Sequence, residues 1–217
     1  RVEAKFQKEI KTTQELELKY LEPWVLGYPV NANFGFLQRV EDTVYIKRDI
    51  ALKTEAMLSK IFSLSVIFAF ERVIPTLYEN QALVFDSRYL ASGIEIKFDS
   101  RDYVYNPMHG LLYKTSYTVG QKKIYNTASF TGQDIPRDFT VQKGAVDLDF
   151  YHSFFKRQSS LISIHGIEIR SPRYESADLF RFGGIRSVRG YRDGQFLASR
   201  AGWSTVETRY SVTRRSF

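Results

Sequence analysis

The stretch RFGGIRSVRGYRDG runs from Arg181 to Gly194, and GWSTVETRYSV follows it from Gly202 to Val212. Glycines and arginines crowd the first stretch, which is typical of a tightly folded loop whose backbone adopts positive φ angles. The second stretch alternates strictly, so that Val206 and Tyr210 share one face and Glu207 lies on the other. The sequence therefore predicts a glycine-held loop that leads into a two-faced β-strand.

The same alternation recurs along most of the chain. Leu64, Val66 and Phe68 share one face of an expected strand, while Ser63 and Ser65 lie on the other. Residues 43–57 contain good helix formers, but their charged and apolar residues alternate with period two, which favours a strand. Strands are expected at residues 1–10, 15–20, 29–37, 43–57, 62–72, 92–99, 111–119, 141–155, 160–170 with a kink or bulge at Gly166, and 205–212. Residues 74–90 are expected to form a longer loop or part of a short strand, and residues 120–137 a loop with a short strand at 127–130.

Composition narrows the class of fold. The chain of 217 residues contains 17 Phe, 14 Tyr and 2 Trp, yet no segment approaches the ~20 apolar residues that a transmembrane helix needs. Strands of roughly ten residues fit the length that a tilted strand needs to cross a bilayer. Because only a closed barrel satisfies every backbone group in lipid, we expect an all-β, antiparallel transmembrane β-barrel, with a soluble β-sandwich as the alternative.

Charge and side-chain chemistry exclude several functions. The net charge of +7 arises from 31 basic and 24 acidic residues, but the basic residues are dispersed and form no basic helix, so we expect no nucleic-acid partner. His109, His152 and His165 lack the spacing of a metal site, and the serines lack a G-x-S-x-G elbow. With no cysteine either, we expect no enzyme, no cofactor and no metal.

The tetrapeptide VRGY and the strand VETRY that follows it resemble a signature of the BamA/TamA outer-membrane protein assembly superfamily. In that family the loop folds into the barrel lumen, and its arginine meets acidic residues of the inner wall. The resemblance implies that the functional loop residues are Gly183, Gly184, Val188, Arg189, Gly190 and Tyr191, and that Glu207 and Arg209 form the contact with the wall.

Two further motifs resemble the same family. FDSRDYVYNPMHG, residues 98–110, is similar to its strand end and turn, and YLEPWVLGYPV, residues 20–30, is similar to a turn near the start of its barrels. Three motifs in the right order are more specific than one. The strand-end turn motif consists of Asp99, Arg101, Asp102, Pro107 and Gly110.

The resemblance also implies an architecture and a location. Barrels of this family have about sixteen strands, whereas residues 1–217 hold about ten to twelve, so we expect a barrel domain cut at both ends. The periplasmic POTRA repeats and the last strands are expected outside this sequence, and residues 214–216 are expected to form a hairpin turn. The expected location is the outer membrane of a diderm bacterium.

The function implied by the resemblance is the insertion and assembly of other outer-membrane β-barrel proteins. The expected partners are the outer-membrane lipid bilayer, unfolded outer-membrane protein clients, and assembly-complex lipoproteins or periplasmic proteins. Two alternatives stay open: a pore that secretes an exoprotein in two-partner secretion, and the barrel portion of a patatin-like phospholipase.

Arg189 carries the most specific expectation. Its planar guanidinium is expected to enter the lumen and make a bidentate contact with the carboxylate of Glu207, which faces away from Val206 and Tyr210. Spacing alone leaves a solvated loop arginine equally open, and the motif favours the lumenal position.

Overall fold

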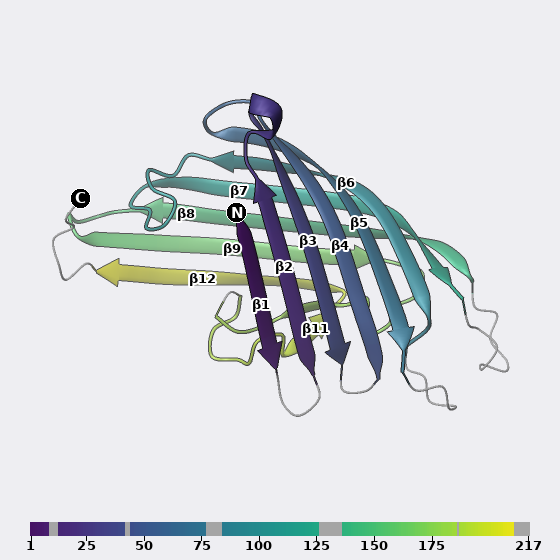
Figure 1. Cartoon of the computed structure of the whole chain (residues 1–217). Coiled ribbons are helices and arrows are strands. Elements are labelled where there is room, and N and C mark those ends of the chain that lie inside the picture. The colour runs from purple at the N-terminus through teal and green to yellow at the C-terminus, as the bar shows by residue number, and fades with distance from the viewer. Residues whose placement is uncertain (9–12, 42–43, 77–83, 126–135, 186, 211–217) are drawn as a thin grey trace.

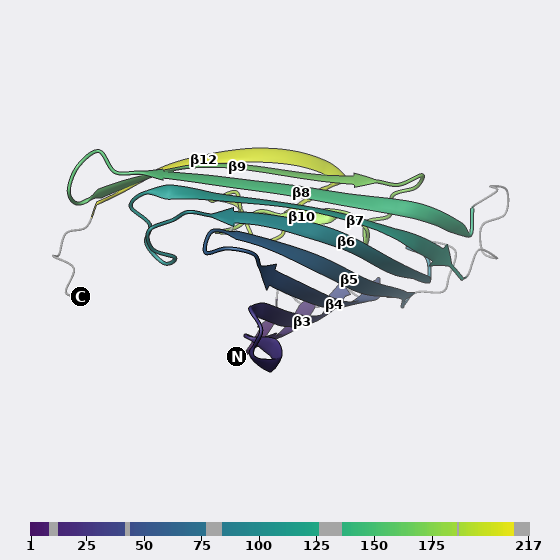
Figure 2. The same ribbon diagram turned by 90° about the horizontal axis from the view of Figure 1, so that it is seen from above.

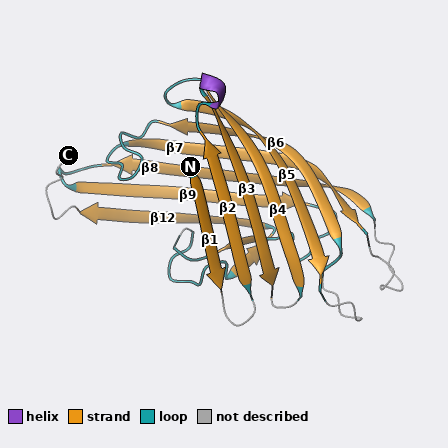
Figure 3. Ribbon diagram, in the orientation of Figure 1, coloured by secondary structure: helices purple, strands orange, loops and turns teal. Residues whose placement is uncertain are grey.

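In the computed structural model, the described residues are 1–8, 13–41, 44–76, 84–125, 136–185 and 187–210. They form an almost purely β structure (Figure 3), with a single turn of 3-10 helix, η1, at Val25–Gly27. No helix in these ranges is long and apolar enough to cross a membrane. The strands are β1 (Val2–Lys8), β2 (Gln14–Glu22), β3 (Val30–Glu41), β4 (Tyr45–Met57), β5 (Phe62–Pro75), β6 (Ser87–Asp99), β7 (Gly110–Ile124), β8 (Asp138–His152), β9 (Gln158–Arg170), β10 (Phe180–Phe182), β11 (Phe196–Ala198) and β12 (Arg200–Tyr210).

Ten of these strands form one antiparallel sheet in the order β1-β2-β3-β4-β5-β6-β7-β8-β9-β12. Each strand pairs with its neighbour in the chain, which is the meander expected of a barrel wall. The sheet curls strongly (Figures 1 and 2), and the short hairpin of β10 and β11 lies on its concave side. Within the described residues β1 and β12 do not pair, so the sheet is open.

The alternation predicted from the sequence is confirmed along the central strands. On β5, Leu64, Val66 and Phe68 are exposed on the convex face, whereas Ser63 and Ser65 are buried on the concave face. We call the concave face, which carries Ser65 of β5 and Lys122 of β7, the inner wall. An apolar outside and a polar inside are the reverse of a soluble domain and match a membrane barrel.

The three longest connections lie at the same end of the sheet. One end has the connections 23–29, 58–61, 100–109 and 153–157, and the other has 76–86, 125–137 and 171–199 together with the short connections 9–13 and 42–44. We call these the short-turn end and the long-loop end. The buried hydrophobic cores lie on the inner wall toward the long-loop end, where Tyr89, Ile124 and Phe139 pack beneath Phe180 of the connection 171–199.

Several boundaries differ from the sequence predictions. The expected loop at 74–90 is wrong at both ends, because β5 continues to Pro75 and β6 already begins at Ser87. Likewise β7 extends to Ile124, so residues 120–124 are strand. In the sequence alone, polar residues favour a loop. At strand positions, however, an inward polar side chain such as Lys122 can pair with the connection 171–199, which lies against the inner wall. The predicted short strand at 127–130 and turn at 214–216 lie outside the described residues.

The expected kink or bulge at Gly166 is also wrong. Gly166 pairs with Val146 on one side and with Gly202 on the other, and both registers continue without interruption. The glycine therefore lies in regular strand, opposite a second glycine.

Candidate functional site

The connection 171–199 lies against the inner wall, and we call it the docked loop. Its tip begins after β10 and depends on glycine backbone. Gly183, Gly184 and Gly190 have φ angles of 123°, 85° and 89°, so the predicted positive φ angles are confirmed for these three residues. A Cβ atom on Gly184 would lie 2.7 Å from Oδ1 of Asp193, so a larger residue would also clash. The Gly183 N–H donates a hydrogen bond of 2.7 Å to Ser187 Oγ, which closes the turn.

Arg189 meets Glu207 of β12, although not in the geometry expected. Its Nη2 lies 2.8 Å from Glu207 Oε2, while Glu207 Oε1 accepts a hydrogen bond of 2.5 Å from Arg209 Nε. Each arginine thus contacts one carboxylate oxygen of Glu207. The expected bidentate contact is wrong, and Arg189 forms an ion pair through one nitrogen. Arg209 takes the other oxygen because it lies two residues along the same strand, on the same face. Since the Arg189 side chain is 56% exposed, the pair contributes only about 0.5–1 kcal/mol.

Tyr191 joins the loop tip to the wall through stacked rings. Its ring packs edge-on against Phe196 of β11 at a centroid distance of 4.8 Å, and Phe196 lies 5.4 Å from Phe182 of β10. Phe182 stacks on Trp203 of β12 at 5.5 Å, and Trp203 stacks on His165 of β9 at 5.2 Å. Five aromatic rings therefore run continuously from the VRGY tetrapeptide to the barrel wall.

The first part of the docked loop is held by buried charges. Lys122 of β7 donates to both carboxylate oxygens of Asp178 at 2.7 Å and to Glu175 at 3.2 Å. The side chains of Lys122 and Glu175 are each 3% exposed. Glu175 also accepts a hydrogen bond of 2.9 Å from the Phe85 N–H, so its second oxygen is satisfied. We call Lys122, Glu175 and Asp178 the root anchor.

Three further contacts secure residues 177–181 of the docked loop. Lys47 of β4 donates a hydrogen bond of 2.9 Å to the carbonyl oxygen of Ala177. Arg181 of β10 lies 3.1 Å from a carboxylate oxygen of Glu41 and donates to the Tyr45 hydroxyl at 3.0 Å. The docked loop is therefore tied to the adjacent strands β3 and β4, to β7 and to β12, which together span most of the sheet.

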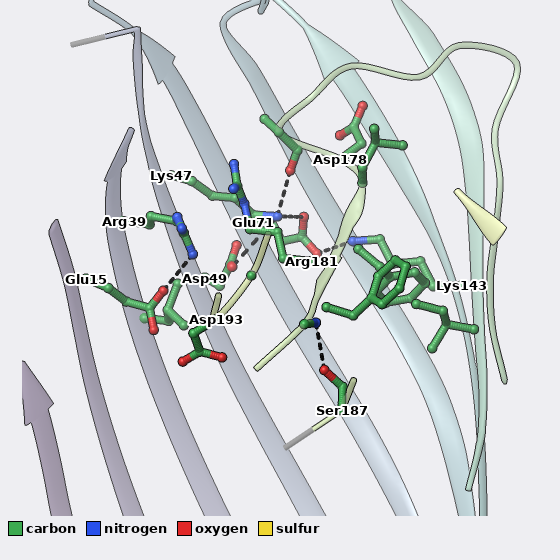
Figure 4. Close-up of a pocket in the computed structure, with 18 of the residues that line it drawn as sticks. Glu15, Arg39, Lys47, Asp49, Glu71, Lys143, Asp178, Arg181, Ser187 and Asp193 are labelled. Carbon is green, nitrogen blue, oxygen red and sulfur yellow. Dashed lines mark hydrogen bonds and ion pairs between the residues drawn. The ribbon is translucent and has the colours of Figure 1, made fainter. Parts of the chain in front are cut away.

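A cavity of 610 Å³ remains between the docked loop and the inner wall (Figure 4). Its wall is charged but internally paired, since Glu71 bridges Lys47, at 3.3 Å, and Lys143. Arg39 pairs with Glu15 at 2.9 Å on the neighbouring strands. No cluster of three or more potential metal ligands occurs among the described residues. The arrangement favours electrostatic docking of a loop.

Three features of the structure agree with one family: the antiparallel meander, the apolar outside with a polar inside, and the VRGY loop docked against the inner wall. The model described as the Omp85 superfamily domain matches residues 1–210. The chain belongs to the Omp85 superfamily. The fold is therefore part of an antiparallel transmembrane β-barrel, and the convex apolar face is the lipid-facing surface. No curated protein matches the chain.

Membership in the Omp85 superfamily establishes the coarse class of function. Its members are outer-membrane β-barrels that insert or translocate proteins, so this chain handles protein substrates in a membrane. The superfamily is typically without enzymatic activity.

The strand-end turn of this Omp85 chain lies at the short-turn end of the sheet, apart from the docked loop. Arg101 holds Asp99 with two hydrogen bonds, Nε to Oδ1 at 2.8 Å and Nη2 to Oδ2 at 2.7 Å. Asp102 Oδ1 accepts backbone N–H bonds from Met108 at 2.9 Å, His109 at 3.2 Å and Tyr103 at 3.0 Å. Partial burial opposes ionisation of Asp102, but these N–H groups prevail and lower the pKa of its carboxyl group.

Pro107 and Gly110 complete the turn. The Pro107 carbonyl accepts a hydrogen bond of 2.6 Å from Ser159 Oγ of β9, which ties the turn to the wall. Gly110 has a φ angle of 117°, and a Cβ atom there would lie 2.5 Å from the Ser100 carbonyl oxygen. The motif therefore caps a hairpin, with no contact to the VRGY tip among the described residues.

Sequence reasoning did not find the root anchor or the aromatic stack. Glu175 and Asp178 appear in the sequence as ordinary polar loop residues, and Lys122 as one residue of a polar segment. A usable signal was Lys122 itself, because it lies between the outward-facing positions 121 and 123 of β7 and therefore points inward.

Proposed function

We propose that this Omp85 chain is the barrel of a protein that inserts and assembles other outer-membrane β-barrel proteins. The observation that carries the proposal is the docked loop, which lies on the concave side of the sheet and is fixed by buried charges. A passive porin requires only an open, polar lumen, so a loop held against the inner wall by buried charges favours a barrel that handles protein substrates.

The proposed mechanism requires no covalent chemistry and no nucleotide. An unfolded client strand offers unpaired backbone N–H and C=O groups, which are costly in lipid. An exposed sheet edge of the barrel satisfies them by β-augmentation, and each added strand then serves as the template for the next. The free energy comes from the backbone hydrogen bonds and apolar burial of the client itself.

In this proposal the loop residues act by position. Gly183, Gly184 and Gly190 allow the tight tip, and Arg189 with Glu207 fastens it to β12. Tyr191 packs on Phe196 beside this contact, and Val188 completes the tetrapeptide. The strand-end turn of Asp99, Arg101, Asp102, Pro107 and Gly110 shapes the short-turn end, where periplasmic partners or assembly-complex lipoproteins would bind. Unfolded outer-membrane proteins are the proposed clients.

A reconstitution experiment tests the proposal. The full-length protein is placed in lipid vesicles, an unfolded barrel client is added, and its folding is followed by gel mobility and protease resistance. We expect faster client folding than in empty vesicles. Arg189→Ala should slow this folding, whereas Arg192→Ala, which removes an exposed arginine of the same loop, should leave it unchanged.

The outcome also separates this proposal from export of an exoprotein. Client folding at the rate of empty vesicles, together with export of a soluble β-rich passenger across the membrane, would contradict assembly and select translocation. Equal effects of Arg189→Ala and Arg192→Ala would remove the VRGY tip from the mechanism.

A further inference from the structure

Four basic residues form a continuous row on the lipid-facing side of the sheet. Arg48 of β4 pairs directly with Arg72 of β5, Arg72 with Arg88 of β6, and Arg88 with Lys123 of β7. We call these residues the cationic row. Arg48, Arg88 and Lys123 are exposed, and their strand neighbours Ile50 and Leu90 point outward with them. Directly opposed like charges destabilise a sheet, so three consecutive pairs of this kind require a counter-charge.

Protein groups supply only part of that counter-charge. Arg72 pairs with Asp86 at 2.5 Å, and its guanidinium packs over the ring of Tyr125 at 5.0 Å. Arg48 donates a hydrogen bond of 2.9 Å to the neutral side chain of Gln38. Lys123 lies directly opposite the exposed Asp138 of β8, which is a second acidic neighbour of the row. Neither Arg88 nor Lys123 forms a hydrogen bond or ion pair with a residue in the described ranges, so four cations face two carboxylates. Unbalanced positive charge therefore remains on this surface.

The row lies where the apolar surface ends. On β5 the lipid-facing residues from Phe62 to Phe70 are uncharged, and Arg72 is the next outward position. From Phe62 to Arg72 the strand rises about 25 Å along the membrane normal, at about 3.3 Å per residue and a tilt of about 40°. That height equals the apolar band of an outer-membrane barrel, so the row begins at the headgroup region.

The opposite edge of the same band has a different chemistry. There Phe62 pairs with Phe98, and Phe98 with Tyr113, which gives an uncharged aromatic row at the short-turn end. Barrels of this kind have short turns on the periplasmic side and long loops outside. The cationic row is therefore confined to the outer leaflet.

The row also spans more than one phosphate. Three strand spacings of about 4.8 Å give it a length of about 14 Å, and the strand tilt makes it climb about 9 Å across the membrane interface. The neighbouring residues agree with this slope. On β4 the next outward residue toward the long-loop end is the apolar Ile46, so the apolar surface extends past Arg48. On β7 the next outward residue toward the short-turn end is the polar Gln121, so the apolar surface ends before Lys123. A headgroup with a single phosphate can reach only part of such a row.

We propose that the cationic row binds the headgroup of a lipid that carries two or more phosphates, in the leaflet on the long-loop side. The acyl chains of that lipid lie along the apolar rows beneath, which include Ile50, Phe70 and Leu90. This site uses only the membrane-spanning fold. A loss of lipid binding with intact client insertion would leave the proposed function standing.

The test uses the full-length protein in neutral detergent, titrated with bisphosphorylated lipid A and followed by native mass spectrometry of the bound lipid. Removing two cations with Arg88→Gln and Lys123→Gln should weaken binding about 30-fold, because each basic residue at an anionic interface contributes about fivefold. The matched control, Lys60→Gln with Arg157→Gln, removes two exposed charges at the short-turn end and should change binding less than about twofold. Arg88→Lys keeps the charge and should keep the binding.

Two further readouts make the result decisive. Dephosphorylated lipid A and phosphatidylglycerol should each bind at least tenfold more weakly than bisphosphorylated lipid A. Without lipid, the double variant should unfold at the same or a higher temperature than the natural protein, because a like-charge repulsion is removed. Binding by the row variant equal to that of its control would overturn the site, and equal binding of phosphatidylglycerol would overturn the requirement for more than one phosphate.

Discussion

Lys122→Met should release the docked loop far more effectively than any change at the loop tip. Lys122 makes both ion pairs of the root anchor, and its loss leaves Glu175 and Asp178 facing each other with no direct ion-pair partner among the described residues. The side chains of these residues are 3%, 3% and 12% exposed, so water screens them little. Removal of one partner from a buried ion pair costs about 3–5 kcal/mol.

Chemical labelling of a single cysteine measures this cost directly. The chain contains no cysteine, and Ala177 in the docked loop is 3% exposed, so Ala177→Cys provides one thiol that reacts only when the loop leaves the wall. At ~1.4 kcal/mol per tenfold change in opening, loss of about 3 kcal/mol accelerates labelling by more than about 100-fold.

Two matched variants define the result. Lys123→Met changes the neighbouring lysine, which points to the opposite face, and should leave the labelling rate unchanged. Adding Glu175→Gln and Asp178→Asn to Lys122→Met removes the uncompensated charges and should restore much of the protection. Equal labelling rates for the Lys122 and Lys123 variants would refute the root anchor as the main support of the loop.

Three smaller effects are expected. Arg189→Ala and Glu207→Gln should each speed labelling of the same cysteine by no more than about fivefold, with the double variant similar to either; additive effects would show that the two side chains act separately. Trp203→Leu removes the ring contact with Phe182, which joins the loop to the wall, and should cost about 0.5–1.5 kcal/mol of loop docking. It should also remove a near-ultraviolet circular dichroism band, and an unchanged band would exclude the stack. Because folding lowers the pKa of the Asp102 carboxyl group, its stabilisation of the turn is complete above its ordinary pKa of 3.8. This stabilisation is lost as the pH falls through the lower pKa of the folded state. Amide exchange at Met108 should therefore accelerate in acid relative to the Asp102→Asn protein. The same ratio at pH 6 and pH 3 would contradict this assignment.

The Arg189 contact shows the reach of motif reasoning. The pairing of Arg189 with Glu207 could be expected because the two residues belong to one recognised signature. The small stabilisation by this ion pair could not be expected, because the exposure of the Arg189 side chain depends on where the loop tip lies above the wall. Arg209 was expected to line the same wall, and only the side-chain geometry reveals that it takes one oxygen of Glu207.

The strand boundaries show a second limit. Alternation located the strands at residues 62–72 and 92–99. The predicted strands ended too early wherever the inner wall carries polar or mixed residues. Residues 87–91 and 120–124 belong to strands because their inward side chains, such as Tyr89 and Lys122, are covered by the docked loop. Burial under a distant segment leaves no local periodic signal.

The sequence by itself determined the two-faced strands, their antiparallel order, the glycine conformations of the loop and the family, because all of these depend on residues close together in the chain. Tertiary structure alone decided the root anchor and the cationic row. Lys122 meets Glu175 and Asp178 across separations of 53 and 56 residues. Arg48, Arg72, Arg88 and Lys123 become neighbours only through the registers of four strands. A shift of one residue in any of those pairings would turn a side chain to the other face, so the position of the charge on the membrane surface is a property of the assembled sheet.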